Sequence, residues 1–92
     1  MSSYRKGRAL EYAVILELRK KGYTYFIRSA GSKGVIDVLA SNGMEILAIQ
    51  VKKNGYISEG EKQQLKAAAE AFKAKPCLIF KENREFQFEF LN

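Results

Sequence analysis

Two apolar segments joined by Asn42-Gly43 constrain the fold of this chain more than any other feature of its sequence. Residues 35–40 and 45–52 are rich in Val, Ile, Leu and Ala, which favours strands of a buried sheet over helix because both segments are short. Asn-Gly between two such segments is a strong hairpin signal. A two-residue hairpin loop places Asp37 opposite Ala48. We therefore predict an antiparallel strand pair, Val35–Ala40 with Glu45–Lys52.

The alternation of side chains along these strands separates an apolar face from a mixed face. The apolar face predicts protein core and contains Ile36, Val38, Leu47, Ile49 and Val51. The mixed face is apolar near the hairpin tip, at Leu39, Ile46 and Ala48, and its far end carries Asp37, Gln50 and Lys52. Polar side chains gathered at one end of a buried sheet indicate a functional site.

The remainder of the chain predicts two helices and three more strands. The first helix is expected at Lys6–Lys21, and its apolar stripe consists of Leu10, Ala13, Val14 and Leu18. The second is expected from a Ser58–Glu61 capping box to Lys73, and its inward-facing residues are Leu65, Ala68, Ala69 and Phe72. The strands are expected at Tyr23–Arg28, Cys77–Phe80 and Phe86–Phe90, and residues 29–34 form a loop. The predicted fold class is α/β in the order α-β-β-β-α-β-β, a mixed central sheet flanked by two helices.

Length and composition exclude several classes of protein. The chain has 92 residues, which fits a single domain, and its formal charge of +6 suggests a polyanionic partner. It contains no histidine, so a Ser-His-Asp triad and a zinc–histidine site are excluded. No segment is apolar enough to span a membrane, and no signal peptide precedes the first helix, so we expect a cytoplasmic protein with no membrane partner. The single cysteine, Cys77, is expected to be buried.

The residue types at the polar end suit metal-dependent phosphodiester cleavage. The Asp37 carboxylate and the Gln50 amide oxygen are hard ligands of the kind that Mg²⁺ prefers, with Mn²⁺ as an alternative ion. Lys52 is placed to stabilise developing negative charge or to orient the attacking water. Glu11 completes the acidic cluster if the first helix covers this end of the sheet.

Each of these residues also has a structural interpretation. Glu11 can be a solvated helix carboxylate, and Asp37 can cap the preceding loop or pair with Arg28. Gln50 and Lys52 can be a polar pair on an edge strand. The coincidence of all four favours the functional interpretation.

Basic residues lie on both sides of the predicted site and would contact phosphates rather than read base sequence. The candidates for DNA binding are Arg5, Lys6, Arg8, Arg28, Ser29, Ser32, Lys33 and Lys53. The alternative is a solvated charged surface, which weighs most for Arg5 and Lys6.

These motifs together resemble the archaeal Holliday junction resolvase family, within the nuclease superfamily that carries an Asp…Glu-x-Lys motif. The similarity extends over roughly Tyr4 to Leu91 and is strongest in residues 28–33, Arg-Ser-Ala-Gly-Ser-Lys, ahead of Asp37. It implies a restriction-endonuclease-like fold in which residues 1–92 form one nuclease domain. It also implies a homodimer that nicks opposing strands of a four-way DNA junction with Mg²⁺.

The resemblance also assigns roles to residues of this chain. It implies that Glu11, Asp37 and Gln50 form the metal site and that Lys52 is the catalytic lysine. Arg28 and Lys33 would then lie near the scissile phosphate, with Ser29 or Ser32 approaching the DNA. Phe72 corresponds to an aromatic residue of the dimer-forming helix.

One departure from the family pattern stands at the centre of the site, because Gln50 occupies the position of the motif glutamate. Glutamine keeps a ligand oxygen but loses the negative charge, so metal affinity should fall. Gln50 is then a tolerated natural variant, the mark of a junction-binding relative that no longer cuts, or an engineered change. A nuclease of the same fold that acts on other branched, mismatched or damaged DNA is a further alternative.

Overall fold

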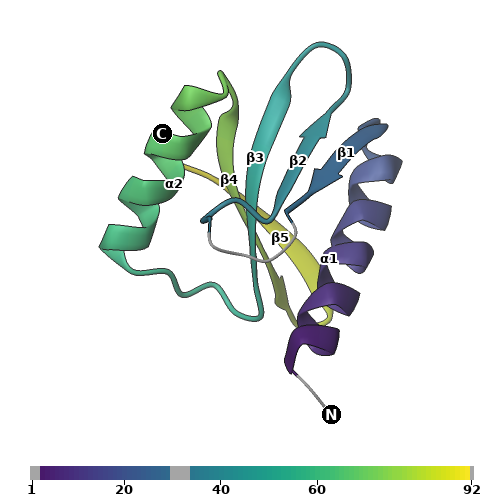
Figure 1. Cartoon of the computed structure of the whole chain (residues 1–92). Coiled ribbons are helices and arrows are strands. Elements are labelled where there is room, and N and C mark those ends of the chain that lie inside the picture. Colours follow the sequence, from purple (N-terminus) through teal and green to yellow (C-terminus); the bar gives the residue numbers. More distant parts are fainter. Residues whose placement is uncertain (1–2, 30–33, 92) are drawn as a thin grey trace.

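A computed structural model describes the backbone of residues 3–29 and 34–91 and the side chains of residues 9–29 and 34–91. Five strands form one sheet that lies between two helices (Figure 1). The elements are α1 (Ser3–Lys20), β1 (Tyr25–Arg28), β2 (Val38–Ser41), β3 (Ile46–Lys52), α2 (Glu59–Ala71), β4 (Lys75–Glu82) and β5 (Glu85–Phe90). The predicted fold class and element order are confirmed.

The sheet is mixed, and its strand order is β1-β2-β3-β4-β5. Strands β3 and β4 are parallel because α2 carries the chain back between them, while every other neighbouring pair is antiparallel. Strand β3 is therefore central, and residues Leu47, Ala48 and Ile49 are at most 1% exposed. Gln50 and Lys52 belong to this central strand, so the edge-strand interpretation of this pair is wrong.

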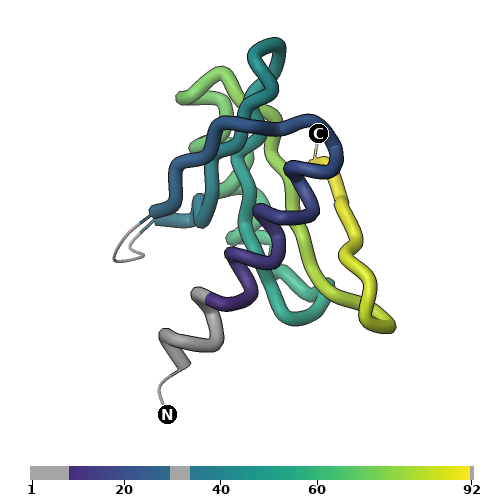
Figure 2. The backbone as a smooth tube through the Cα atoms, turned by 90° about the vertical axis from the view of Figure 1, so that its right-hand side faces the viewer, coloured from purple at the N-terminus to yellow at the C-terminus, as the bar shows by residue number. Residues whose placement is uncertain are grey.

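Helix α1 covers the apolar face of the sheet, and Figure 2 shows it lying in front of the strands. Val14 and Leu18 from α1 pack against Val38, Leu47 and Ile49 in the larger hydrophobic core. The predicted stripe of α1 is confirmed at these two positions, which are fully buried. The helix ends as expected before Gly22, whose φ of +99° is a left-handed conformation that glycine adopts without strain.

Helix α2 covers the opposite face of the sheet and begins with the predicted capping box. The Ser58 side chain accepts a hydrogen bond from the Glu61 backbone N–H, and the Glu61 side chain accepts one from the Ser58 backbone N–H. Leu65 and Ala69 are fully buried beneath the helix. Phe72 lies at the C-terminal cap and is turned toward the sheet as expected, but it is 55% exposed and so is not part of the buried core.

The hairpin between β2 and β3 has a longer loop than predicted. Ser41 pairs with Ile46, and the Asn42 side chain accepts hydrogen bonds from the backbone N–H groups of Met44 and Glu45. This local turn leaves four residues outside the ladder, because an Asn side chain at the first turn position replaces strand pairing. The predicted register, with Asp37 opposite Ala48, is therefore wrong by two residues, and Leu39 pairs with Ala48.

Strand β2 also begins later than predicted, at Val38 rather than Val35. The Asp37 N–H donates to the Ile49 carbonyl at 2.7 Å, but its side chain takes the next backbone donor, so regular pairing stops. Ile36 consequently leaves the predicted core face and lies on the α2 side, where it lines a hollow beside Leu39.

Smaller differences occur at other element ends. Strand β1 begins at Tyr25, because the Tyr23 N–H donates to the Leu18 carbonyl and so closes the end of α1. Cys77 is fully buried as predicted, and burial raises the pKa of its thiol to about 12. No helix in the part of the chain that the structure describes is long and apolar enough to cross a membrane.

The packing of α2 leads to a stability prediction. Leu65→Ala removes a fully buried side chain between α2 and the sheet, so the free energy of unfolding should fall by about 2–5 kcal/mol. Gln64→Ala, at an exposed position of the same helix, should change it by less than about 0.5 kcal/mol. Urea denaturation followed by circular dichroism measures both values, and equal costs would contradict the described packing.

Candidate functional site

Asp37 lies where the ladder between β2 and β3 ends. Its carboxylate accepts a hydrogen bond from the Val51 backbone N–H at 2.8 Å. Burial raises the pKa of Asp37 above its ordinary value, the Val51 N–H opposes that shift, and the Glu11 carboxylate adds to it. The structural interpretation of Asp37 is therefore correct in part: it caps a backbone group, but that group is on β3.

Gln50 projects from the central strand at the same end of the sheet. Its residue is 9% exposed, and its side-chain oxygen Oε1 is buried with no hydrogen-bond partner among the described residues. An unpaired buried polar atom typically costs about 1–3 kcal/mol, so proteins keep few of them. This oxygen is therefore an acceptor that adds no stability to the part of the fold that the structure describes.

Glu11 and Arg28 join α1 to β1 through an ion pair. The Arg28 Nη2 and Nε atoms lie 2.9 and 3.2 Å from Glu11 Oε1, and both side chains are partly buried. The Arg28 guanidinium also stacks over the Tyr12 ring, 4.6 Å from its centroid. Glu11 is therefore not a solvated carboxylate, and the partner of Arg28 is Glu11 rather than Asp37.

Lys52 forms a second ion pair, with a residue that the sequence identified only as a helix cap. Lys52 Nζ lies 3.1 Å from Glu61 Oε2. The Ser58 backbone N–H, and next the Lys52 ammonium, lower the pKa of Glu61. The capping motif was visible in the sequence, but nothing in the nine-residue separation linked it to Lys52.

The structure thus brings the predicted residues together at one end of the sheet. Gln50 and Lys52 lie on one strand, and Glu11 and Lys52 are close enough to Asp37 to shift its pKa in opposite directions. Within residues 9–29 and 34–91, no three Asp, Glu, Cys or His side chains form a preassembled metal cage. The oxygen that Gln50 contributes is an amide oxygen, which is a weaker ligand than a carboxylate.

The predicted DNA-binding residues are described only in part. The Ser29 backbone N–H donates to the Asp37 carbonyl at 3.0 Å, which ties the start of the Ser29–Gly34 loop to the site. Lys53 follows β3 and is exposed. Ser32, Lys33 and the side chains of Arg5, Lys6 and Arg8 lie outside the described residues.

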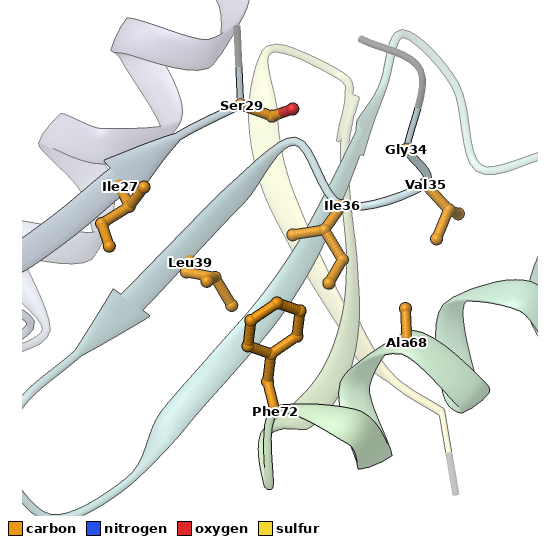
Figure 3. A pocket seen from close by; sticks show the side chains of 8 residues that line it. All are labelled: Ile27, Ser29, Gly34, Val35, Ile36, Leu39, Ala68 and Phe72. Atoms are coloured by element: carbon orange, nitrogen blue, oxygen red, sulfur yellow. The ribbon is translucent and has the colours of Figure 1, made fainter.

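A second feature lies on the same face of the sheet as α2, which covers the mixed face only in part. A hollow of about 280 Å³ separates β1 and β2 from the end of α2, and Figure 3 shows Phe72 pointing toward Leu39 and Ile36 across it. Ile27 from β1 also lines it and is 67% exposed. The apolar edge formed by Ile27, Ile36, Leu39 and Phe72 is called here the open apolar face.

Comparisons with known proteins agree with this architecture. Residues 2–92 match the family model of the archaeal Holliday junction resolvase (Hjc). A similar solved structure is that of Hjc from Archaeoglobus fulgidus, a Holliday junction resolvase from an archaeal hyperthermophile. It is 34% identical with a TM-score of 0.78, over 94% of this chain and 73% of that chain. The family predicted from the residue motifs is confirmed, and the chain belongs to the archaeal Holliday junction resolvase (Hjc) family of junction-resolving nucleases.

Proposed function

We propose that this chain is a Mg²⁺-dependent endonuclease that resolves four-way DNA junctions by paired nicks, with its centre at Asp37, Gln50 and Lys52. The observation that carries the proposal is the buried, unpartnered Oε1 of Gln50 at the end of the sheet where Asp37 lies. The Hjc family supports the substrate class.

The donor set fits a divalent cation. Gln50 supplies an oxygen that no donor in residues 9–29 and 34–91 uses, and Asp37 carries a carboxylate whose burial is unfavourable without a nearby positive charge. A carboxylate and an amide oxygen suit Mg²⁺, which retains several waters, and Mn²⁺ suits the same ligands. Glu11 is the further acidic residue of the proposed site. When bound, the cation would polarise the phosphate and lower the pKa of a coordinated water.

The protein side chains then bind and orient the DNA. Lys52 would donate hydrogen bonds to a non-bridging oxygen of the scissile phosphate, where negative charge develops. Arg28, oriented by Glu11, supplies a second cation beside the site. The remaining candidates, Arg5, Lys6, Arg8, Ser29, Ser32, Lys33 and Lys53, would contact the flanking backbone and make affinity depend strongly on salt.

Cleavage of a labelled four-way junction tests the proposal. We expect paired nicks with Mg²⁺ or Mn²⁺ and none in EDTA. Asp37→Ala and Lys52→Ala should each lower the rate by at least about 100-fold, because the first removes a proposed metal ligand and the second removes a cation beside the developing negative charge. Lys20→Ala, which removes an exposed lysine paired with Glu17, is the matched control and should leave the rate unchanged.

Gln50→Glu distinguishes the alternatives for this departure from the family pattern. Restoring the carboxylate should raise the cleavage rate and lower the Mg²⁺ concentration required. If the wild-type chain binds the junction without cutting and Gln50→Glu cuts it, the chain is a junction-binding relative instead. Faster cutting of a mismatched duplex would indicate a nuclease for another substrate.

The raised pKa of Asp37 predicts how pH and metal change stability. Because the folded-state pKa is raised, the wild-type chain loses stability as pH rises from the ordinary value of 3.8 through the folded-state value. In EDTA at pH 7, Asp37→Asn should therefore be more stable by about 0.5–2 kcal/mol, and the difference should vanish well below pH 3.8. Chemical denaturation at several pH values measures this difference.

Mg²⁺ provides the matching control for this prediction. A cation that binds the folded state stabilises it by mass action, so Mg²⁺ should raise the melting temperature of the wild-type chain more than that of Asp37→Asn. Equal Mg²⁺ responses in both proteins would remove Asp37 from the metal site.

We also propose that the functional unit is a homodimer formed through the open apolar face. Ile27 and Phe72 are 67% and 55% exposed at its rim, and a contiguous apolar patch of this kind marks an association surface. A symmetric dimer would present two sites, one for each strand to be nicked.

Phe72→Glu tests the dimer. A buried charge at a symmetric interface appears twice, so the variant should be monomeric in size-exclusion chromatography with light scattering, whereas the wild-type chain should be a dimer. Leu16→Glu is the matched control, because Leu16 is 61% exposed on α1, on the other side of the sheet. A wild-type monomer, or dissociation by both variants alike, would contradict this interface.

A further inference from the structure

We propose that Glu61 is a positioning residue for the proposed catalytic lysine, holding the Lys52 ammonium at the site from the first turn of α2. The inference rests on the proposed function for its catalytic consequence. It adds to the family motif a residue from a different element, which the comparisons do not assign.

The Glu61 carboxylate is fixed by contacts at both oxygens. Oε1 accepts from the Ser58 backbone N–H at 3.2 Å and lies 3.3 Å from the Ser58 hydroxyl, while Oε2 lies 3.1 Å from Lys52 Nζ. The Ser58 hydroxyl in turn accepts from the Glu61 backbone N–H at 3.2 Å. One oxygen therefore anchors the side chain to the capping box, and the other is directed at the lysine.

Lys52 depends on such an anchor because of its place in the fold. It is the last residue of β3, its side chain is 32% exposed, and an exposed loop follows it. A lysine side chain is long and flexible, so its ammonium has no fixed position without a partner. Over the residues whose side chains are described, Glu61 provides the carboxylate within 4.0 Å of Lys52 Nζ, and no second one does.

The neutral Gln50 increases the importance of Glu61. A glutamate two residues before Lys52, as in the family pattern, would offer the ammonium a charged neighbour on its own strand, and an amide does not. In this chain, the charged partner comes instead from α2. The capping box thus has two roles, since it begins the helix and also directs a carboxylate to the end of β3.

Three variants separate these roles. Glu61→Gln keeps the capping box, in which Gln is as suitable as Glu, but removes the charge that faces Lys52. Ser58→Ala removes the cap and leaves that charge. Glu61→Ala removes that charge and the side-chain half of the capping box, but keeps the bond from the backbone N–H of residue 61 to the Ser58 hydroxyl. For each variant, we would measure the single-turnover cleavage rate, the junction Kd, the melting temperature and the rate at which acetic anhydride labels Lys52, followed by mass spectrometry without DNA.

Glu61→Gln should label about 2- to 5-fold faster at Lys52, the ratio that corresponds to a partly exposed ion pair. Its cleavage rate should fall roughly 10- to 100-fold, the range expected when a reacting group is misplaced, with an unchanged Kd and melting temperature. Ser58→Ala should melt about 4–8 °C lower while labelling and cleaving nearly as the wild-type chain does. Glu61→Ala should label and cleave as Glu61→Gln does, and its melting temperature should fall by less than that of Ser58→Ala.

A double-mutant cycle adds a readout that a purely structural role would not produce. In a Lys52→Ala background, Glu61→Gln should have no further effect on cleavage, because the two residues act as one unit. Unchanged labelling of Lys52 in Glu61→Gln would overturn the proposal. The proposal would also be overturned if, across the three variants, the loss of cleavage were proportional to the loss of melting temperature. Suppose that Lys52 is labelled faster in Glu61→Gln than in the wild-type chain, but that neither the wild-type chain nor Gln50→Glu cuts any junction. The proposed function then fails, while the role of Glu61 in holding Lys52 stands.

Discussion

The hydrogen bond from the Val51 backbone N–H to the Asp37 carboxylate is the contact on which the arrangement of the site depends. It satisfies a backbone donor of the central strand at the point where β2 no longer pairs, so the sheet ends without an unpaired N–H. The same contact fixes a carboxylate at the boundary between the two helical layers. Glu11 approaches this boundary from α1, and Lys52 and Glu61 meet beside it from β3 and α2.

The end of the sheet departs from the rules that govern the rest of the protein. Buried positions elsewhere in the described core are apolar, whereas here a carboxylate loses hydration and the Gln50 oxygen finds no donor among the side chains and backbone that the structure describes. Both features oppose folding, and the cores on either side of the sheet offset them. Such local conflicts are typical of functional sites, where side chains are arranged for a ligand rather than for stability.

The sequence predicted the face that carries the site better than it predicted the register. A shift of two residues moves each cross-strand partner but leaves the paired side chains of β2 and β3 on their predicted faces, so Gln50 and Lys52 still share a face although the hairpin loop was wrong. Only before β2 does the pattern fail, where Ile36 changes to the α2 side. The start of β2 was missed because it depends on a side-chain-to-backbone bond between residues fourteen positions apart. The role of Glu61 was missed for a similar reason. Local patterns identify a capping box, but they do not show which strand lies beside it.

The charged residues at the site and the neutral Gln50 have different roles. Arg28 and Lys52 are each paired with a glutamate from a flanking helix, and among the described side chains neither forms an ion pair with Asp37. These ion pairs hold the Arg28 guanidinium and the Lys52 ammonium in place. In the proposed function, both groups remain available to the phosphate of the DNA. Gln50 contributes an oxygen but no charge, so in the proposed site it weakens cation binding and leaves Glu61 as the charged partner of Lys52. Under the proposed function, junction binding would depend on the basic residues around the site, whereas the identity of residue 50 would govern metal binding and with it the cleavage step.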